Sequence, residues 1–176
     1  MLARHILAGL LLLASSAWAT TLEKLSVEQM IQQSSAIVRA KVAGSFTANR
    51  NGTIYTYYHL QVTENLKSST PSTVDVAVPG GSVGRVMQSV AGAPELKQGG
   101  EYVLFLWTSR SGLTQIIGLS QGAFDVRANA AGVVVSRPAA SDQMLDARGH
   151  VVVDSGVTLN LSDLRARIDA LVGGVR

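Results

Sequence analysis

The chain has 176 residues, and its 15 Lys and Arg against 12 Asp and Glu give a formal net charge of +3. The basic residues are scattered without the clustering that nucleic-acid binding requires, so we expect no nucleic-acid partner. The lack of any cysteine excludes both a disulfide framework and lipid attachment through a cysteine thioether. We therefore expect one ordinary domain over residues 20–176, stabilised by its core alone.

The first residues have the pattern of a secretory signal peptide. Arg4 supplies a positive start, residues 6–14 are an apolar run, and Ala17 and Ala19 have the spacing of a cleavage site. The apolar run is shorter than the roughly 20 residues that span a bilayer core. We expect cleavage between Ala19 and Thr20, no membrane anchor after cleavage, and a periplasmic or secreted mature protein.

The next elements have clear local signals. Ser26 and Gln29 have the spacing of a capping box, which predicts a short helix from about residue 27 to 33. Residues 36–42 alternate between apolar and basic side chains and predict a half-buried strand. We expect residues 44–52 to form a loop whose Asn-Gly tip suits a hairpin turn.

A long strand is predicted over residues 54–66, rich in tyrosine and β-branched side chains. Alternation places one set of side chains on the core face: Ile54, Thr56, Tyr58, Leu60 and Val62. The opposite face then holds Tyr55, Tyr57 and His59. We expect these side chains to form a recognition surface with Arg50 at its rim. The alternative is that Phe46, the C-terminal helix or the 136–150 segment covers these side chains.

The remainder of the chain reads as short strands followed by a helix. We expect strands at 74–78, 102–107, 114–119, 123–127, 133–137 and 151–153, weak pairing within 82–90, and a helix from about 161 to 171. The apolar runs at 102–107 and 114–119 are bounded by Gly, Ser or Pro, as buried strands are. The fold class predicted is mainly β: a small, partly open OB-like barrel with a short N-terminal helix and a docked C-terminal helix.

One motif suggests an enzyme. Residues 118–122 match G-x-S-x-G, and Ser120, Asp146 and His150 follow in the order of an α/β-hydrolase triad. That motif needs a helix after the serine, whereas residues 123–126 read as a strand. We expect no metal and no cofactor, because the two histidines beyond the signal peptide are far apart, and residues 80–85 read as a glycine turn rather than a phosphate loop.

Longer blocks carry a family resemblance. The chain contains, in order between Leu25 and Val126, the blocks SSAIVRAKV, NGTIYTYYHLQVTENLK, VPGG, GAPELKQGGEYVLFLW and GLSQGAFDV. In this order they resemble a group of small exported bacterial proteins of unknown function, although Ser68 stands where that group usually has Gly. The first two blocks are also similar to the netrin-like, OB-type barrel of tissue metalloproteinase inhibitors. Those inhibitors act through an N-terminal Cys on zinc, so their mechanism does not transfer to a chain without cysteine.

These patterns predict a non-catalytic, exported binding or interaction module. Its partner is an unknown protein or small ligand in the cell envelope, and the ligand-binding residues predicted are Tyr55, Tyr57, His59 and Arg50. A small serine hydrolase that uses Ser120 with Asp146 and His150 is the alternative.

Overall fold

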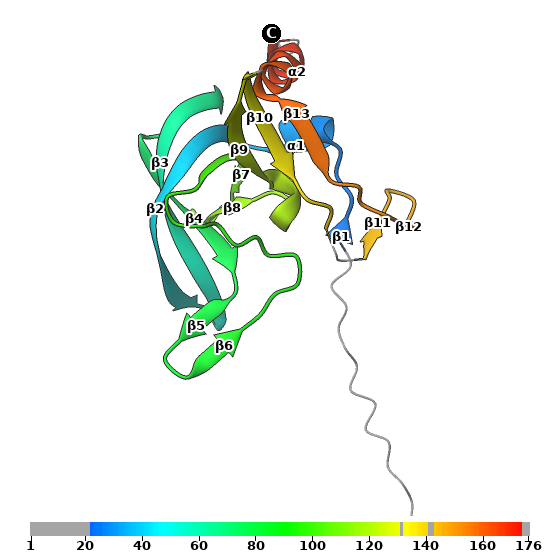
Figure 1. Cartoon of the computed structure of the whole chain (residues 1–176). Helices are drawn as coiled ribbons and strands as arrows, with labels where there is room; N and C mark the ends of the chain where they lie inside the picture. Colours follow the sequence, from blue (N-terminus) through cyan, green and yellow to red (C-terminus); the bar gives the residue numbers. More distant parts are fainter. Residues whose placement is uncertain (1–21, 131, 141–142, 174–176) are drawn as a thin grey trace, which may run out of the picture.

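A curved antiparallel sheet of eight strands organises the part of the chain that the computed structural model describes, residues 22–130, 132–140 and 143–173 (Figure 1). Its strands are β2 (Ala36–Arg50), β3 (Thr53–Lys67), β4 (Thr73–Pro79), β7 (Glu101–Thr108), β8 (Thr114–Ile116), β9 (Ala123–Asn129), β10 (Gly132–Arg137) and β13 (Val157–Asn160). They lie in the order β13-β10-β9-β7-β2-β3-β4, and β8 and β9 share one edge of β7. β4 lies beside β8, but no strand pairing joins these two described strands, so the sheet curls without closing. The predicted mainly β, partly open fold is confirmed.

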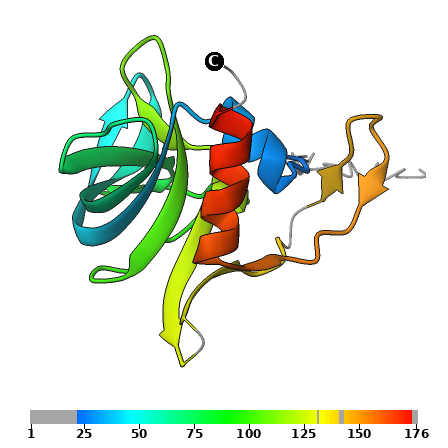
Figure 2. The same ribbon diagram turned by 90° about the horizontal axis from the view of Figure 1, so that it is seen from above.

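Two helices, a short turn and two small sheets complete the described chain. They are α1 (Val27–Gln33), α2 (Leu161–Gly173), the 3-10 turn η1 (Leu119–Gly122), the hairpin of β5 (Gly81–Val83) and β6 (Val86–Gln88), and the sheet of β1 (Leu22–Glu23), β11 (Met144–Leu145) and β12 (Val151–Val152). Both predicted helices are present, and Figure 2 shows them side by side. The capping box is also confirmed: Ser26 Oγ accepts from the Gln29 amide at 3.1 Å, and Gln29 Oε1 accepts from the Ser26 amide at 2.8 Å.

The predictions for the N-terminal segment fall on residues that the structure does not describe. The signal peptide and its cleavage between Ala19 and Thr20 fall on residues 1–21, outside the described chain. Neither described helix is long and apolar enough to cross a membrane.

Two hydrophobic cores share β7. Because side chains alternate along a strand, Val103 and Phe105 face a core with α1 and α2, while Leu104 and Leu106 face the concave side of the curved sheet. All four side chains are at most 1 % exposed. The apolar run predicted as a buried strand is therefore buried on both faces.

The prediction of a loop at residues 44–52 is wrong, because β2 continues to Arg50. Along this stretch β2 pairs with β3 residue by residue after a register shift between Val42 and Gly44. Only Asn51 and Gly52 form the turn, with φ of 53° and 85°, which are left-handed values that the Asn-Gly pair tolerates. Residues such as Gly44, Ser45 and Asn49 have low strand propensity, and pairing with β3 overrides it.

The strand predicted at 114–119 is too long, because β8 ends at Ile116. Gly118 and Leu119 both have φ near 60°, a left-handed conformation that ends the extended chain and begins η1. The short strands β1, β11 and β13 were not predicted.

The core face predicted for β3 is confirmed, because Ile54, Tyr58 and Leu60 are buried.

Candidate functional site

Three aromatic side chains form a row on the outer face of the β2–β3 ribbon. This aromatic row consists of Phe46, Tyr57 and Tyr55. The rings of Phe46 and Tyr57 stack with centroids 5.0 Å apart and an interplanar angle of 8°, and the ring of Tyr55 lies 6.2 Å from that of Tyr57. Phe46 is 53 % exposed, and the two tyrosines are half-buried. Phe46 thus covers part of Tyr57, as the alternative expected, and is itself the most exposed ring of the row.

The two polar residues predicted beside the row both have partners. His59 Nδ1 lies 2.8 Å from Asp75 Oδ1 on the neighbouring strand β4, and both side chains are 50 % exposed. At the other end, Arg50 Nη2 donates to the carbonyl oxygen of Ser111 at 2.9 Å. The row is therefore an apolar centre between two polar ends.

The three residues of the hydrolase alternative come from two separate places. Asp146 Oδ2 lies 3.3 Å from His150 Nδ1 on the exposed β11–β12 hairpin, and hydrogen bonds from the backbone amides of His150 and Arg148 lower the pKa of Asp146. Ser120 lies in η1, at the centre of the molecule in Figure 1, whereas the hairpin lies at its right edge. In the described chain no hydrogen bond joins Ser120 to His150 or Asp146, and a strand, β9, follows the serine.

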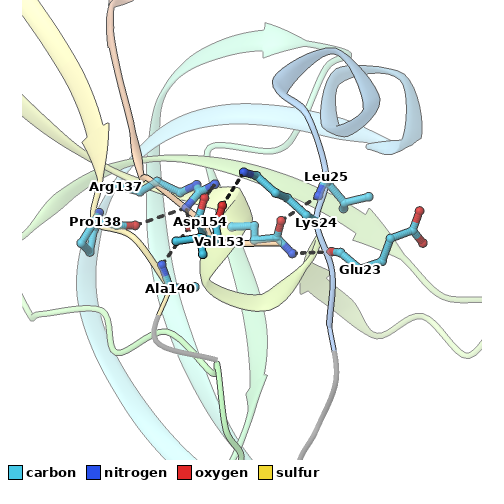
Figure 3. Close-up of polar contacts among 9 residues, drawn as sticks. Glu23, Lys24, Leu25, Arg137, Pro138, Ala140, Val153 and Asp154 are labelled. Carbon is cyan, nitrogen blue, oxygen red and sulfur yellow. Dashed lines mark hydrogen bonds and ion pairs between the residues drawn. The ribbon is translucent and has the colours of Figure 1, made fainter. Parts of the chain in front are cut away.

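The G-x-S-x-G sequence instead builds a tight turn. Gly118 takes φ of 60°, which opens the turn, and a Cβ at Gly122 would lie 2.5 Å from the carbonyl oxygen of Ile117. Between them, Gln121 is fully buried. Its Oε1 accepts from the amide of Leu25 and its Nε2 donates to the carbonyl of Glu23, both at 2.8 Å (Figure 3 labels these two partners). The motif thus holds the start of the described chain.

The first testable consequence concerns Gly122. We expect Gly122→Ala to lower the free energy of unfolding by about 1–3 kcal/mol, because the new methyl group meets a backbone oxygen that cannot rotate away. Gly44→Ala is the matched control, since a Cβ there meets nothing within 4 Å, and its effect should stay within about 0.5 kcal/mol. Urea denaturation measures both variants. Equal effects at the two glycines would contradict this role of Gly122.

A pocket of about 430 Å³, here called the polar pocket, lies between the 92–97 segment, β9 and the 138–140 segment. Tyr102 and Ser120 also line it. Four ionisable side chains surround it, Glu95, Lys97, Asp125 and Arg127, and none of them makes an ion pair within the described chain. The sequence analysis did not predict this pocket, because its walls come from distant segments.

Buried tyrosine hydroxyls hold one wall of the polar pocket. Tyr58 Oη accepts from the amide of Leu96 at 3.2 Å, and Tyr102 Oη accepts from the amide of Lys97 at 2.9 Å. Burial raises the pKa of Tyr58. The amide of Ser120 donates to the carbonyl of Gly92 at 3.0 Å, which fixes the same segment from the floor. This wall is fixed by contacts at Gly92, Leu96 and Lys97.

A buried ion pair holds the opposite wall. Arg137 and Asp154 are 5 % and 7 % exposed, and two hydrogen bonds of 2.5 and 3.2 Å join the guanidinium to the carboxylate. Arg137 also donates to the carbonyl of Pro138, and Asp154 accepts from the amide of Ala140 at 2.8 Å (Figure 3). Burial alone would raise the pKa of Asp154, but the hydrogen bonds from Arg137 and the Ala140 amide hold it at about 2. Arg137 Nε has no hydrogen-bond partner in the described chain.

The polar residues of the interior are concentrated near this pocket. The buried polar side chains of the described chain are Ser34, Gln121, Arg137 and Asp154. Gln121 follows Ser120 in η1 and bonds to Glu23 and Leu25, whereas Arg137 and Asp154 hold the 138–140 segment. A sequence signal existed for one of them, because Asp154 directly follows a run of three valines. No cluster of three or more His, Cys, Asp or Glu among the described residues could hold a metal ion.

Comparison with known proteins gives no relative. No family model matches the sequence, and neither the curated proteins nor the solved structures contain a match. The resemblances to the exported bacterial group and to netrin-like barrels remain predictions.

Proposed function

We propose that the protein is a non-catalytic interaction module that acts in the cell envelope or outside the cell, and that it binds another protein through the aromatic row. The observation that carries this proposal is the exposure of Phe46, 53 % of whose surface is open to solvent while its ring stacks on Tyr57. A large exposed aromatic side chain, supported by further rings, is typical of the centre of a protein interface.

The shape of the surface favours a protein over a small molecule. Small ligands bind in concave sites, and the five pockets described for this chain are lined by residues other than those of the aromatic row. The Phe46 and Tyr57 rings face each other, so they do not form a flat platform on which a sugar ring could stack. An apolar centre between the His59–Asp75 pair and Arg50 matches the apolar core and polar rim of protein interfaces.

Two further features support the rest of the proposal. The signal-peptide pattern at residues 1–19 supports export. The separation of Ser120 from His150 supports a non-catalytic role, because a serine nucleophile needs its base within hydrogen-bond reach. Ester hydrolysis by the purified protein that disappears in Ser120→Ala would overturn this part of the proposal.

We expect the double variant Phe46→Ala, Tyr57→Ala to weaken partner binding at least about tenfold, since each ring removed from an interface costs about 1–2 kcal/mol. Its free energy of unfolding should fall by no more than about 1–2 kcal/mol, because Phe46 is exposed and Tyr57 half-buried. The partner is first captured from an envelope fraction on immobilised protein, and its affinity is then measured by isothermal titration calorimetry with both purified components.

The control removes a similar apolar surface elsewhere. Val86 and Met87, on the β5–β6 hairpin, are 63 % and 79 % exposed. Val86→Ala, Met87→Ala should leave the affinity within about twofold of wild type if the aromatic row is the interface. A partner that binds the row variant as tightly as wild type, or that is lost only with the hairpin variant, would contradict the proposed surface.

A further inference from the structure

Beyond the proposed interface, we propose that the polar pocket binds a small zwitterion with an apolar side group, namely a free amino acid or a short peptide. The pocket is distinct from the aromatic row and shares no lining residue with it.

The size and apolar lining of the pocket fit such a ligand. A volume of about 430 Å³ lies within the range of small-molecule sites, roughly 300–1,000 Å³. Besides the charged side chains and those of Ser120 and Tyr102, the lining includes apolar side chains, with Ala93, Pro94 and Leu96 on one wall and Ala123 and Ala139 on the others. An aliphatic side chain would bury surface there, and a ligand that consists only of charged groups would leave this lining without a partner.

The charged side chains around the pocket favour a ligand that carries both a positive and a negative group. Lys97 and Arg127 supply two positive groups, and Glu95 and Asp125 supply two negative groups. Since none of the four makes an ion pair in the described chain, each is available to a ligand. A simple anion would meet the two carboxylates and a simple cation the two basic groups, so a molecule with one ammonium and one carboxylate group fits best.

The supporting contacts preorganise the walls. The Arg137–Asp154 pair is not needed for stability alone, because two apolar side chains of similar volume often stabilise a fold as much as a buried ion pair or more. This pair instead fixes Pro138 and Ala140, while Tyr102 and Tyr58 fix the 92–97 segment. Walls held before the ligand arrives reduce the ordering cost of binding.

The test uses the dipeptide alanyl-leucine and its N-acetylated amide, which has the same side chains without either charge. Each is titrated into the 15N-labelled protein, and the backbone amide signals of Gly92, Leu96 and Ala140 are followed by NMR. We expect alanyl-leucine to shift these signals in a saturable way with a dissociation constant of about 1 mM or tighter. The uncharged analogue should bind at least about tenfold more weakly, because it loses the charge-assisted hydrogen bonds.

Substitutions of the charged residues test whether these residues bind the dipeptide. Lys97→Gln and Asp125→Asn should each weaken binding of alanyl-leucine at least about tenfold, since each removes the charge that one end of the ligand would bind. Lys41→Gln and Asp169→Asn are the matched controls, because both residues are exposed and lie outside the pocket, and they should bind as wild type does.

The outcomes separate this proposal from the proposed interface. Failure of alanyl-leucine to give saturable shifts up to about 10 mM would overturn the pocket proposal, and so would equal binding of the uncharged analogue. Phe46→Ala, Tyr57→Ala should bind the dipeptide as wild type does. Loss of dipeptide binding in that variant would place the ligand on the aromatic row and would also overturn the pocket proposal.

Discussion

Replacement of Asp154 by alanine is expected to lower the free energy of unfolding by about 3–5 kcal/mol. The substitution leaves the guanidinium of Arg137, 5 % exposed, without its anionic partner, and it removes the acceptor of the Ala140 amide. An uncompensated buried charge is far more destabilising than an absent pair. For a domain of this size the melting temperature should fall by roughly 10 °C.

Urea denaturation and thermal melting measure this effect. Asp169→Ala is the control, because this exposed aspartate of α2 should change stability by no more than about 0.5 kcal/mol. The double variant Arg137→Met, Asp154→Leu should recover a large part of the loss, since it removes both charges together. If Asp154→Ala were as stable as wild type, the buried pair would have no role in holding the 138–140 segment.

The same variant gives a second readout through pH. The folded protein holds the pKa of Asp154 at about 2 against an ordinary value of 3.8, because hydrogen bonds from Arg137 and Ala140 outweigh the effect of burial. A folded pKa below the unfolded value contributes stability that is fully present above about pH 4 and is lost as the pH falls towards 2. Wild type should therefore lose about 2 kcal/mol more than Asp154→Ala over this window.

Replacement of Gln121 by alanine is expected to cost about 2–4 kcal/mol of unfolding free energy. The side chain is fully buried, and its removal leaves a cavity and deprives both the Glu23 carbonyl and the Leu25 amide of their partner. The segment before α1 should then detach locally. Hydrogen exchange of the Leu25 amide would rise together with the loss of stability.

A second glutamine supplies the comparison for Gln121. Gln98 is exposed and donates to the carbonyl of Ala43 at 3.3 Å, so Gln98→Ala should cost no more than about 0.5 kcal/mol. Unchanged exchange of the Leu25 amide in Gln121→Ala would show that other contacts hold this segment.

Elements with local signals were predictable from the sequence. The capping box of Ser26 and Gln29 joins residues three positions apart, and the core face of β3 follows from its alternation. That Tyr55 and Tyr57 share the opposite, outer face was predictable for the same reason, whereas alternation could not decide that Phe46 would cover part of Tyr57. The second half of β2 was not, because its strand conformation depends on pairing with β3 rather than on the propensities of residues such as Gly44 and Asn49.

The turn at Ser120 and the polar pocket depend on contacts that no local pattern contains. Gln121 binds residues 96 and 98 positions away, and Arg137 and Asp154 are 17 positions apart. The G-x-S-x-G match suggested a nucleophile, whereas the strained residues around Ser120 shape a turn. Which distant segments meet is decided by the sheet order, and the sequence alone did not reveal that order.

The position of β7 also bears on aggregation. The run from Tyr102 to Trp107 is uncharged, apolar and rich in strand-forming residues, which suits it to pair with another copy of itself. In the folded protein β2 occupies one edge of this strand, and β8 and β9 occupy the other. This strand can therefore pair with another copy only after β2, or β8 and β9, separate from it. The contacts that stabilise the fold therefore also keep this segment from pairing with another copy.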